Sequence, residues 1–450
     1  MTQNNRGLFR AADGRNLVVT FALVSSLFLL WGFCNGMIDV MDKHFQRELH
    51  LNLAQSAWVQ FAHYLGYFLM ALPAGWLATK LGYKGGIIAG LLLVAVGGFW
   101  FIPATHIAKF WAFLAGVCTI AAGLTFLETV ANPYTTVLGP PAFAATRINL
   151  AQSCNGIGWI LGPIAGGLFF YSTDASGVST GSQTLWIPYA GVAVVVIVLA
   201  AVFYLASVPD LKTEDAYHLD DAPPGASTSI WAHPHFVLAV AAQFLYVAAQ
   251  AGIFSFFINY MTTETPPIPA AWNGGLTAGW FQTNAGGALA ISDKGAAYLA
   301  SLGFVCFLAG RFSGAAILKK FAAHRVLGLY GLLNVAVCFL IFLKLGWLSV
   351  ACVFLSYFFM SIMFPTIFAL GIHGLGARAK RASAYIVMAI MGGAILPKIM
   401  GAVGDAYGMS RSFIVPLCCF GFVAFYGFAW KKLSRVEAPT AAALASVKAH

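Results

Sequence analysis

The chain has 450 residues, of which 60% are hydrophobic and only 9% are charged, and its mean hydropathy is +0.80. Soluble globular domains carry about 25% charged residues, so this composition excludes an ordinary soluble protein and indicates a membrane protein. The formal net charge is +10. The sequence places no basic cluster in a soluble domain, which argues against nucleic-acid binding.

Twelve apolar segments follow one another along the chain, each about 20 residues or longer, which is enough to cross a bilayer as a helix. Helices are the expected form because hydrocarbon offers the backbone no hydrogen-bond partners. The fourth and tenth segments are long enough to contain a break. The predicted fold is an all-α membrane protein with twelve transmembrane helices at residues 18–44, 54–79, 85–105, 109–138, 147–171, 185–208, 235–261, 295–318, 324–343, 347–375, 382–405 and 411–430.

Basic residues in the short connections predict the orientation of these helices. Most Lys and Arg residues, among them Arg6, Lys84 and Arg378, fall on the side that also holds both ends of the chain. Both termini are therefore expected in the cytoplasm. The stretch Met1–Asn16 is polar and the first apolar run is too long for a signal peptide, so no cleavable leader is expected.

Two polar stretches suggest how the chain is organised. Residues 208–234 are acidic and contain Pro223-Pro224, which is typical of a linker. Residues 262–293 are expected to be an irregular outer loop, and a variable insert is favoured over a lid. The predicted domains are a cytoplasmic N-terminus at 1–17, a six-helix half at 18–208, a linker at 209–234, a second six-helix half at 235–430 and a cytoplasmic C-terminus at 431–450.

The two halves resemble each other weakly. Pro73-Ala-Gly75 corresponds to Phe312-Ser-Gly314, and Gly162-Pro163 corresponds to Leu396-Pro397. Because such matches occur in the same order in corresponding helices, they indicate a duplicated transporter of two pseudo-symmetric halves. In folds of this kind the substrate site lies near the middle of the membrane, between the repeats.

Asp39 and Glu128 are acids in otherwise apolar predicted spans. A carboxylate in hydrocarbon costs several kcal/mol, roughly 3 on insertion scales, so such a group usually faces water, has a partner or takes up a proton. Two isolated acids in the membrane therefore predict proton-linked transport, with Asp39 and Glu128 as the proton-coupling residues.

Carboxamides accompany these acids at helical spacings. Residues three or four apart share a face of a helix, and three helices of the first half carry such pairs: Asn35 with Asp39, Glu128 with Asn132, and Gln152 with Asn155. Hydrogen bonds that only hold helices together are the alternative interpretation. The two acids in the cluster favour a functional one.

The seventh span contains amides and aromatic rings but no acid. Amides both donate and accept hydrogen bonds, and aromatic faces suit the apolar side of a sugar ring. A neutral, hydroxyl-rich solute is therefore expected rather than an anion or a bulky apolar drug. The predicted substrate-binding residues are Trp31, Asn35, Asn132, Gln152, Asn155, Tyr246, Gln250 and Asn259.

The run from Leu127 to Pro140, Leu-Glu-Thr-Val-Ala-Asn-Pro-Tyr-Thr-Thr-Val-Leu-Gly-Pro, and the following Arg147-Ile-Asn-Leu-Ala-Gln152 resemble the fucose/galactose/glucose–proton symporter family of the major facilitator superfamily. The L-fucose–proton symporter branch is the most similar. The resemblance implies that Asp39 and Glu128 couple proton and sugar movement. In that branch the first span reads Asn-Asn-x-x-Asp, whereas here Gly36 follows Asn35.

These patterns predict a symporter that imports a monosaccharide, such as L-fucose, galactose or glucose, together with protons by alternating access. An exporter or drug–proton antiporter of the same fold and a non-transporting membrane sensor are the alternatives, and an enzyme is not expected. The eight cysteines show no metal-ligand spacing, so neither a metal nor a cofactor besides the proton is expected. The expected protein is a monomer in a bacterial inner membrane.

Overall fold

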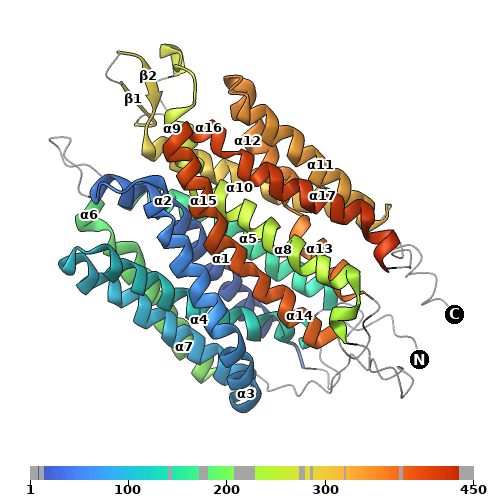
Figure 1. Ribbon diagram of the computed structural model, residues 1–450. Coiled ribbons are helices and arrows are strands. Elements are labelled where there is room, and N and C mark those ends of the chain that lie inside the picture. Colours follow the sequence, from blue (N-terminus) through green and yellow to red (C-terminus); the bar gives the residue numbers. More distant parts are fainter. Residues whose placement is uncertain are drawn as a thin grey trace. The chain divides into compact units, whose positions relative to one another are not determined.

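The computed structural model describes residues 9, 15–139, 144–171, 181–206, 229–272, 279–283, 287–318, 321–373, 375 and 379–434, and most of them are helical (Figure 1). The helices of the first part of the chain are α1 (Val18–Glu48), α2 (Leu53–Ser56), α3 (Trp58–Ile107), α4 (Phe110–Val137), α5 (Ala144–Phe169), α6 (Gly181–Thr184) and α7 (Trp186–Leu205). The remaining α-helices and strands are α8 (Pro234–Ser255), α9 (Phe257–Thr263), β1 (Phe281–Thr283), β2 (Leu289–Ile291), α10 (Asp293–Leu318), α11 (Ala323–Phe342), α12 (Trp347–Met360), α13 (Met363–Ile372), α14 (Ala379–Met388), α15 (Gly392–Tyr407), α16 (Met409–Ser412) and α17 (Ile414–Ser434).

Ten helical stretches in the described part of the chain are long and apolar enough to cross a membrane. The two other predicted spans, 54–79 and 147–171, correspond to the first part of α3 and to α5. A break at Gly82, with φ of 68°, separates the second span from the third within α3. Glycine adopts this left-handed backbone conformation without the steric cost that a Cβ brings.

The tenth predicted span is interrupted, whereas the fourth is the continuous helix α4. Residues Ser361 and Ile362 separate α12 from α13. At this break the Tyr246 hydroxyl donates to the Met360 carbonyl over 3.0 Å, and the Ser361 hydroxyl donates to the Phe358 carbonyl over 2.7 Å. Side chains thus replace helical hydrogen bonds where a membrane helix is broken.

The chain forms two compact units. Unit 1 consists of Met1–His50 and Ala62–Ala216, and unit 2 consists of Leu51–Phe61 and Tyr217–His450. Unit 2 therefore includes a segment, 51–61, that the sequence places in the first half. The rest of the predicted domain organisation stays a prediction.

Within unit 1, α1 and α5 pack backbone against backbone. A Cβ at Gly162 would lie 2.7 Å from the Cα of Gly36, and one at Gly158 would overlap the Leu29 carbonyl. Small residues at helix contacts permit this close approach in membranes, where packing and hydrogen bonds drive association. The contact fixes the position of α1, which carries several predicted site residues.

Within unit 2, α17 packs beside both α11 and α8, and α15 also packs on α8 (Figure 1). The segment that contains α2 lies against α15. Asp405 of α15 accepts hydrogen bonds from the backbone N–H groups of Leu53 at 2.9 Å and Ala54 at 3.0 Å. Nearby, the Lys398 ammonium lies 4.1 Å from the centroid of the Trp58 ring. A carboxylate at the start of a helix and a cation–π contact both favour this arrangement.

The stretch 262–293, predicted to be irregular, is partly ordered. Strands β1 and β2 pair antiparallel, with Phe281 opposite Ile291. Residues 273–278 and 284–286 lie outside the described residues. An extended hairpin rather than a fully irregular loop therefore precedes α10.

Glu264, directly after α9, connects three parts of unit 2. Its Oε2 atom lies 2.9 Å from the Lys344 Nζ atom, and its Oε1 atom accepts a hydrogen bond of 3.2 Å from the Ser410 N–H. Burial by itself would raise the pKa of the Glu264 carboxyl. The bonds from Lys344 and Ser410 outweigh that effect and lower its pKa below the ordinary value.

The α1–α5 contact leads to a first prediction. Gly158→Ala should lower the free energy of unfolding by about 1–3 kcal/mol, the usual cost of overpacking, because the new methyl group overlaps the Leu29 carbonyl. Thermal unfolding in detergent measures the effect. Gly191→Ala on α7 is the matched control, since nothing lies within 4 Å of its added methyl group. Equal unfolding temperatures for both variants would contradict the close packing.

Glu264 leads to a second prediction. Because its folded pKa lies below the unfolded value of about 4.3, the ionised group stabilises the fold above that pH. The contribution is lost as the pH falls through the folded pKa. Glu264→Gln should therefore lower the unfolding temperature at neutral pH, with a smaller effect in acid. A difference of the same size at both pH values would mean that the ion pair is not its cause.

Candidate functional site

Three predicted site residues lie along α1. Trp31, Asn35 and Asp39 follow at intervals of four residues, which places them on one face of the helix. Asn35 is 6% and Asp39 is 8% exposed, and Trp31 is partly buried. The structure thus encloses an acid and an amide within unit 1.

Tyr67 of α3 joins this group. The Trp31 Nε1 atom donates a hydrogen bond of 2.5 Å to the Tyr67 hydroxyl oxygen. The Asn35 side chain is also hydrogen-bonded to this hydroxyl, and Glu128 interacts with it electrostatically. The phenol of α3 therefore meets an indole and an amide of α1 and interacts electrostatically with an acid of α4.

Glu128 lies on α4 and is partly buried. The hydroxyls of its neighbours Thr125 and Thr129 donate to carbonyls four residues earlier in the same helix, each over 2.8 Å. Those hydroxyls therefore satisfy the helix backbone. The side chain of Asn132, predicted to bind substrate, lies outside the described residues.

The two predicted residues of α5 differ in their surroundings. Asn155 is 4% exposed, and its Nδ2 atom donates to the Phe28 carbonyl of α1 over 3.2 Å. This bond joins two helices, which is the alternative role that the sequence analysis gave for such amides. Gln152 is only partly buried. Substrate binding by either residue stays a prediction.

Unit 2 holds the other predicted binding residues. Tyr246 is fully buried with its hydroxyl bonded to Met360, Asn259 is 4% exposed, and Gln250 is partly buried. The guanidinium of Arg311 lies 5.1 Å from the Phe307 ring centroid and interacts electrostatically with Tyr246. In this structure Tyr246 supports the break between α12 and α13, and its predicted contact with substrate is untested.

Sequence reasoning missed Tyr67 and its neighbour His63. The His63 ring centroid lies 5.0 Å from that of Tyr67, and the His63 side chain is 5% exposed. The sequence did contain a signal, because His63 and Tyr67 are aromatic side chains with polar atoms and lie four residues apart in an otherwise apolar span. It was weak because such rings also serve as ordinary packing residues.

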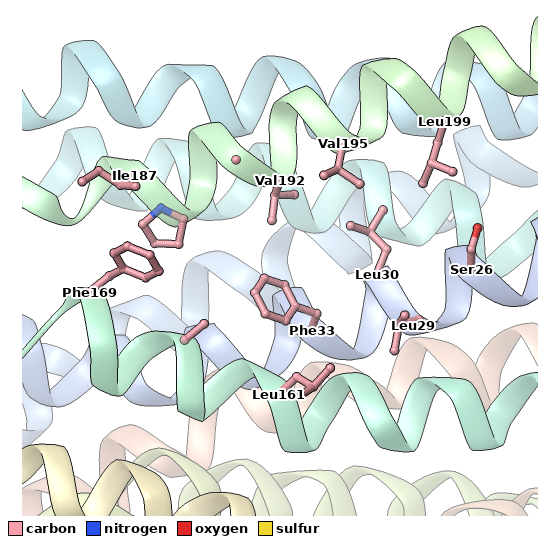
Figure 2. Close-up of a pocket in the computed structure, with 13 residues that line it drawn as sticks. Ser26, Leu29, Leu30, Phe33, Leu161, Phe169, Ile187, Val192, Val195 and Leu199 are labelled. Atoms are coloured by element: carbon pink, nitrogen blue, oxygen red, sulfur yellow. The ribbon is translucent and has the colours of Figure 1, made fainter.

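Unit 1 also contains an apolar groove of about 550 Å³ between α1, α5 and α7. Figure 2 shows Phe33, Leu161 and Val192 facing it, and among the described residues that line it only Ser26 is polar. None of the predicted site residues lines this groove. It suits hydrocarbon rather than a sugar, because a sugar leaves many hydroxyls to be hydrogen-bonded.

In the described ranges, no group of three or more His, Cys, Asp or Glu side chains is placed to hold a metal ion. The groups around Tyr67 are a carboxyl, an amide, an indole and a phenol.

Comparison with known proteins decides the family. The profile of the Major Facilitator Superfamily matches residues 19–375. The chain belongs to this superfamily. It is 36% identical to the L-fucose-proton symporter of Escherichia coli (strain K12), covering 94% of this chain and 95% of that protein. It is 34% identical to a glucose/galactose transporter of Brucella abortus, with 92% and 94% covered.

A solved structure agrees with this membership. The crystal structure of the E. coli fucose:proton symporter is similar to this chain with a TM-score of 0.64 and 33% identity, over 92% of this chain and 99% of that one. The major facilitator fold and the resemblance to the fucose/galactose/glucose–proton symporters are thereby confirmed. This member of the superfamily is an integral membrane protein.

Proposed function

We propose that this superfamily member is a proton-coupled symporter that imports a monosaccharide, with L-fucose, galactose and glucose as the first candidates. The observation that carries the proposal is the group of unit 1 in which the Tyr67 hydroxyl is hydrogen-bonded to Trp31 and Asn35 and interacts electrostatically with Glu128. Similarity to an L-fucose-proton symporter and a glucose/galactose transporter supports the substrate class.

The proposed role of each residue follows from the chemistry of its side chain. Glu128 and Asp39 take up protons from the outer side, because a neutral carboxyl is tolerated in the membrane far better than a charged one. Asn35 and Trp31 provide hydrogen bonds and an aromatic face for a sugar. Loss of the charge then permits the loaded carrier to change its access from outside to inside.

The setting of the protein is part of the proposal. The carrier resides in a bacterial cytoplasmic membrane with both termini in the cytoplasm, as the distribution of basic residues favours. It acts as a monomer and needs no cofactor besides the coupling proton. Transport rather than catalysis is its activity.

Sugar-induced alkalinisation of a lightly buffered suspension of de-energised cells tests the function. One sugar among L-fucose, D-galactose, D-glucose, D-mannose, D-fructose and N-acetylglucosamine should raise the external pH. Glu128→Gln and Asp39→Asn should each abolish the signal, because an amide cannot carry the proton. No signal with any of these sugars, despite protein in the membrane, would refute the proposal.

The matched control is Glu264→Gln. This substitution makes the same chemical change at an acid of unit 2 that is engaged by Lys344. At neutral pH and equal expression it should leave the alkalinisation in place. If Glu264→Gln and Glu128→Gln abolished the signal alike, Glu128 would have no specific role in proton coupling.

A further inference from the structure

The apolar groove between α1, α5 and α7 has a lining that matches hydrocarbon. Figure 2 shows Val195 and Leu199 of α7 facing Leu30 of α1. Ser26, the one polar residue among the described residues that line the groove, donates its hydroxyl to the Leu23 carbonyl over 2.7 Å. Its proton is therefore already in use. Because a polar group buried without a partner is costly, the part of a ligand that occupies this groove must be apolar.

The groove exists because α7 is held against α3 rather than along α1. The Tyr189 ring of α7 stacks on the Phe101 ring of α3, with 3.9 Å between the ring centroids. One turn further along α7, the Ala193 Cβ atom would lie 2.9 Å from a Cβ added at Gly98 of α3. In unit 2, α17 packs beside α8, whereas the corresponding α7 and α1 are separated by the groove. The packing of α7 on α3 thus fixes the opening.

The groove is open to the surroundings of the protein. Val195 is 51% and Leu161 is 43% exposed, although both line it. Because this superfamily member is an integral membrane protein, its apolar helices are surrounded by lipid chains. In that environment close packing of apolar groups, rather than release of water, drives association. A groove of about 550 Å³ between three helices gives an acyl chain walls on several sides.

Lys84 of α3 supplies a positive charge beyond one end of the groove. Its Nζ atom donates to the Ala206 carbonyl over 2.9 Å. Ala206 follows Leu199 by seven residues, so it continues the groove-lining face of α7. In the described part of the chain, the contacts of the Lys84 ammonium are this carbonyl and the Tyr204 ring, 5.9 Å away, and neither carries a charge. An ammonium has three donors, so two are available to a phosphate.

We propose that the groove binds an acyl chain of an anionic phospholipid from the cytoplasmic leaflet, with the lipid phosphate at Lys84. The lengths agree. Gly191, which lines the groove, lies about 22 Å from Ala206 along the helix, and one leaflet with its headgroups is about 20–22 Å thick. Basic side chains at the cytoplasmic ends of membrane helices attract anionic headgroups. The leaflet follows from the orientation proposed above, and the site does not depend on sugar transport.

Lipid binding to the purified protein tests the proposal. Native mass spectrometry should detect one retained phospholipid. Phosphatidylglycerol added to the detergent solution should raise the unfolding temperature more than phosphatidylcholine with the same acyl chains, because a ligand of the folded state stabilises it. Gly191→Leu places a branched side chain in the groove, where an added Cβ meets nothing within 4 Å. This variant should fold, lose the retained lipid and lose the shift in unfolding temperature.

Two further variants separate the groove from the charge. Gly421→Leu makes the same change on α17, where an added Cβ also meets nothing within 4 Å, and it should keep the lipid and the shift. Lys84→Gln removes the charge but keeps a donor for the Ala206 carbonyl. It should still retain lipid, and phosphatidylglycerol and phosphatidylcholine should then stabilise it equally.

Each outcome decides the proposal. Loss of lipid in Gly191→Leu and loss of the headgroup preference in Lys84→Gln, with Gly421→Leu unchanged, would support it. Lipid retained in Gly191→Leu, or equal stabilisation of the unmodified protein by both lipids, would overturn it. A dimer by light scattering that becomes a monomer in Gly191→Leu would also overturn it, because the groove would then be an interface between two copies of the chain.

Discussion

Hydrocarbon offers no hydrogen bonds, and this constraint explains where polar side chains lie in the structure. Where α12 and α13 are separated, Tyr246 satisfies the Met360 carbonyl. On α4, Thr125 and Thr129 bond to their own helix. The Tyr67 hydroxyl likewise accepts a hydrogen bond from the Trp31 indole N–H. These side chains therefore have a structural reason for their partners, and buried polar atoms without a partner are the ones that call for another explanation.

That distinction separates Asn155 from Asn35. Both are buried amides on tightly packed helices, but Asn155 uses its nitrogen to join α5 to the Phe28 carbonyl. The Asn35 oxygen instead has no hydrogen-bond partner in the described part of the chain. The glycines of the α1–α5 contact hold α1 in place, so Asn35 is a fixed group with an unused hydrogen-bond acceptor. Pre-organisation of this kind lowers the cost of ordering on binding.

The apolar groove and the polar group of unit 1 differ in what they offer a ligand. The groove between α1, α5 and α7 is roomy but offers little beyond Ser26 for hydrogen bonding. The group around Tyr67 is compact and combines donors, an acceptor and an acid. For a solute covered with hydroxyls, unpaired polar groups decide where binding is favourable, because every buried hydroxyl needs a partner.

The sequence by itself determined the fold class, since apolar segments of the required length permit only helices in a bilayer. It also singled out Asp39 and Glu128, because an acid in an apolar run is conspicuous without any structure. The tertiary structure alone decided that Tyr67 joins Trp31, Asn35 and Glu128, and that the segment 51–61 packs on α15. Periodicity gives the face on which a residue lies but not the neighbour it meets. Those contacts depend on how helices far apart in the chain pack against one another.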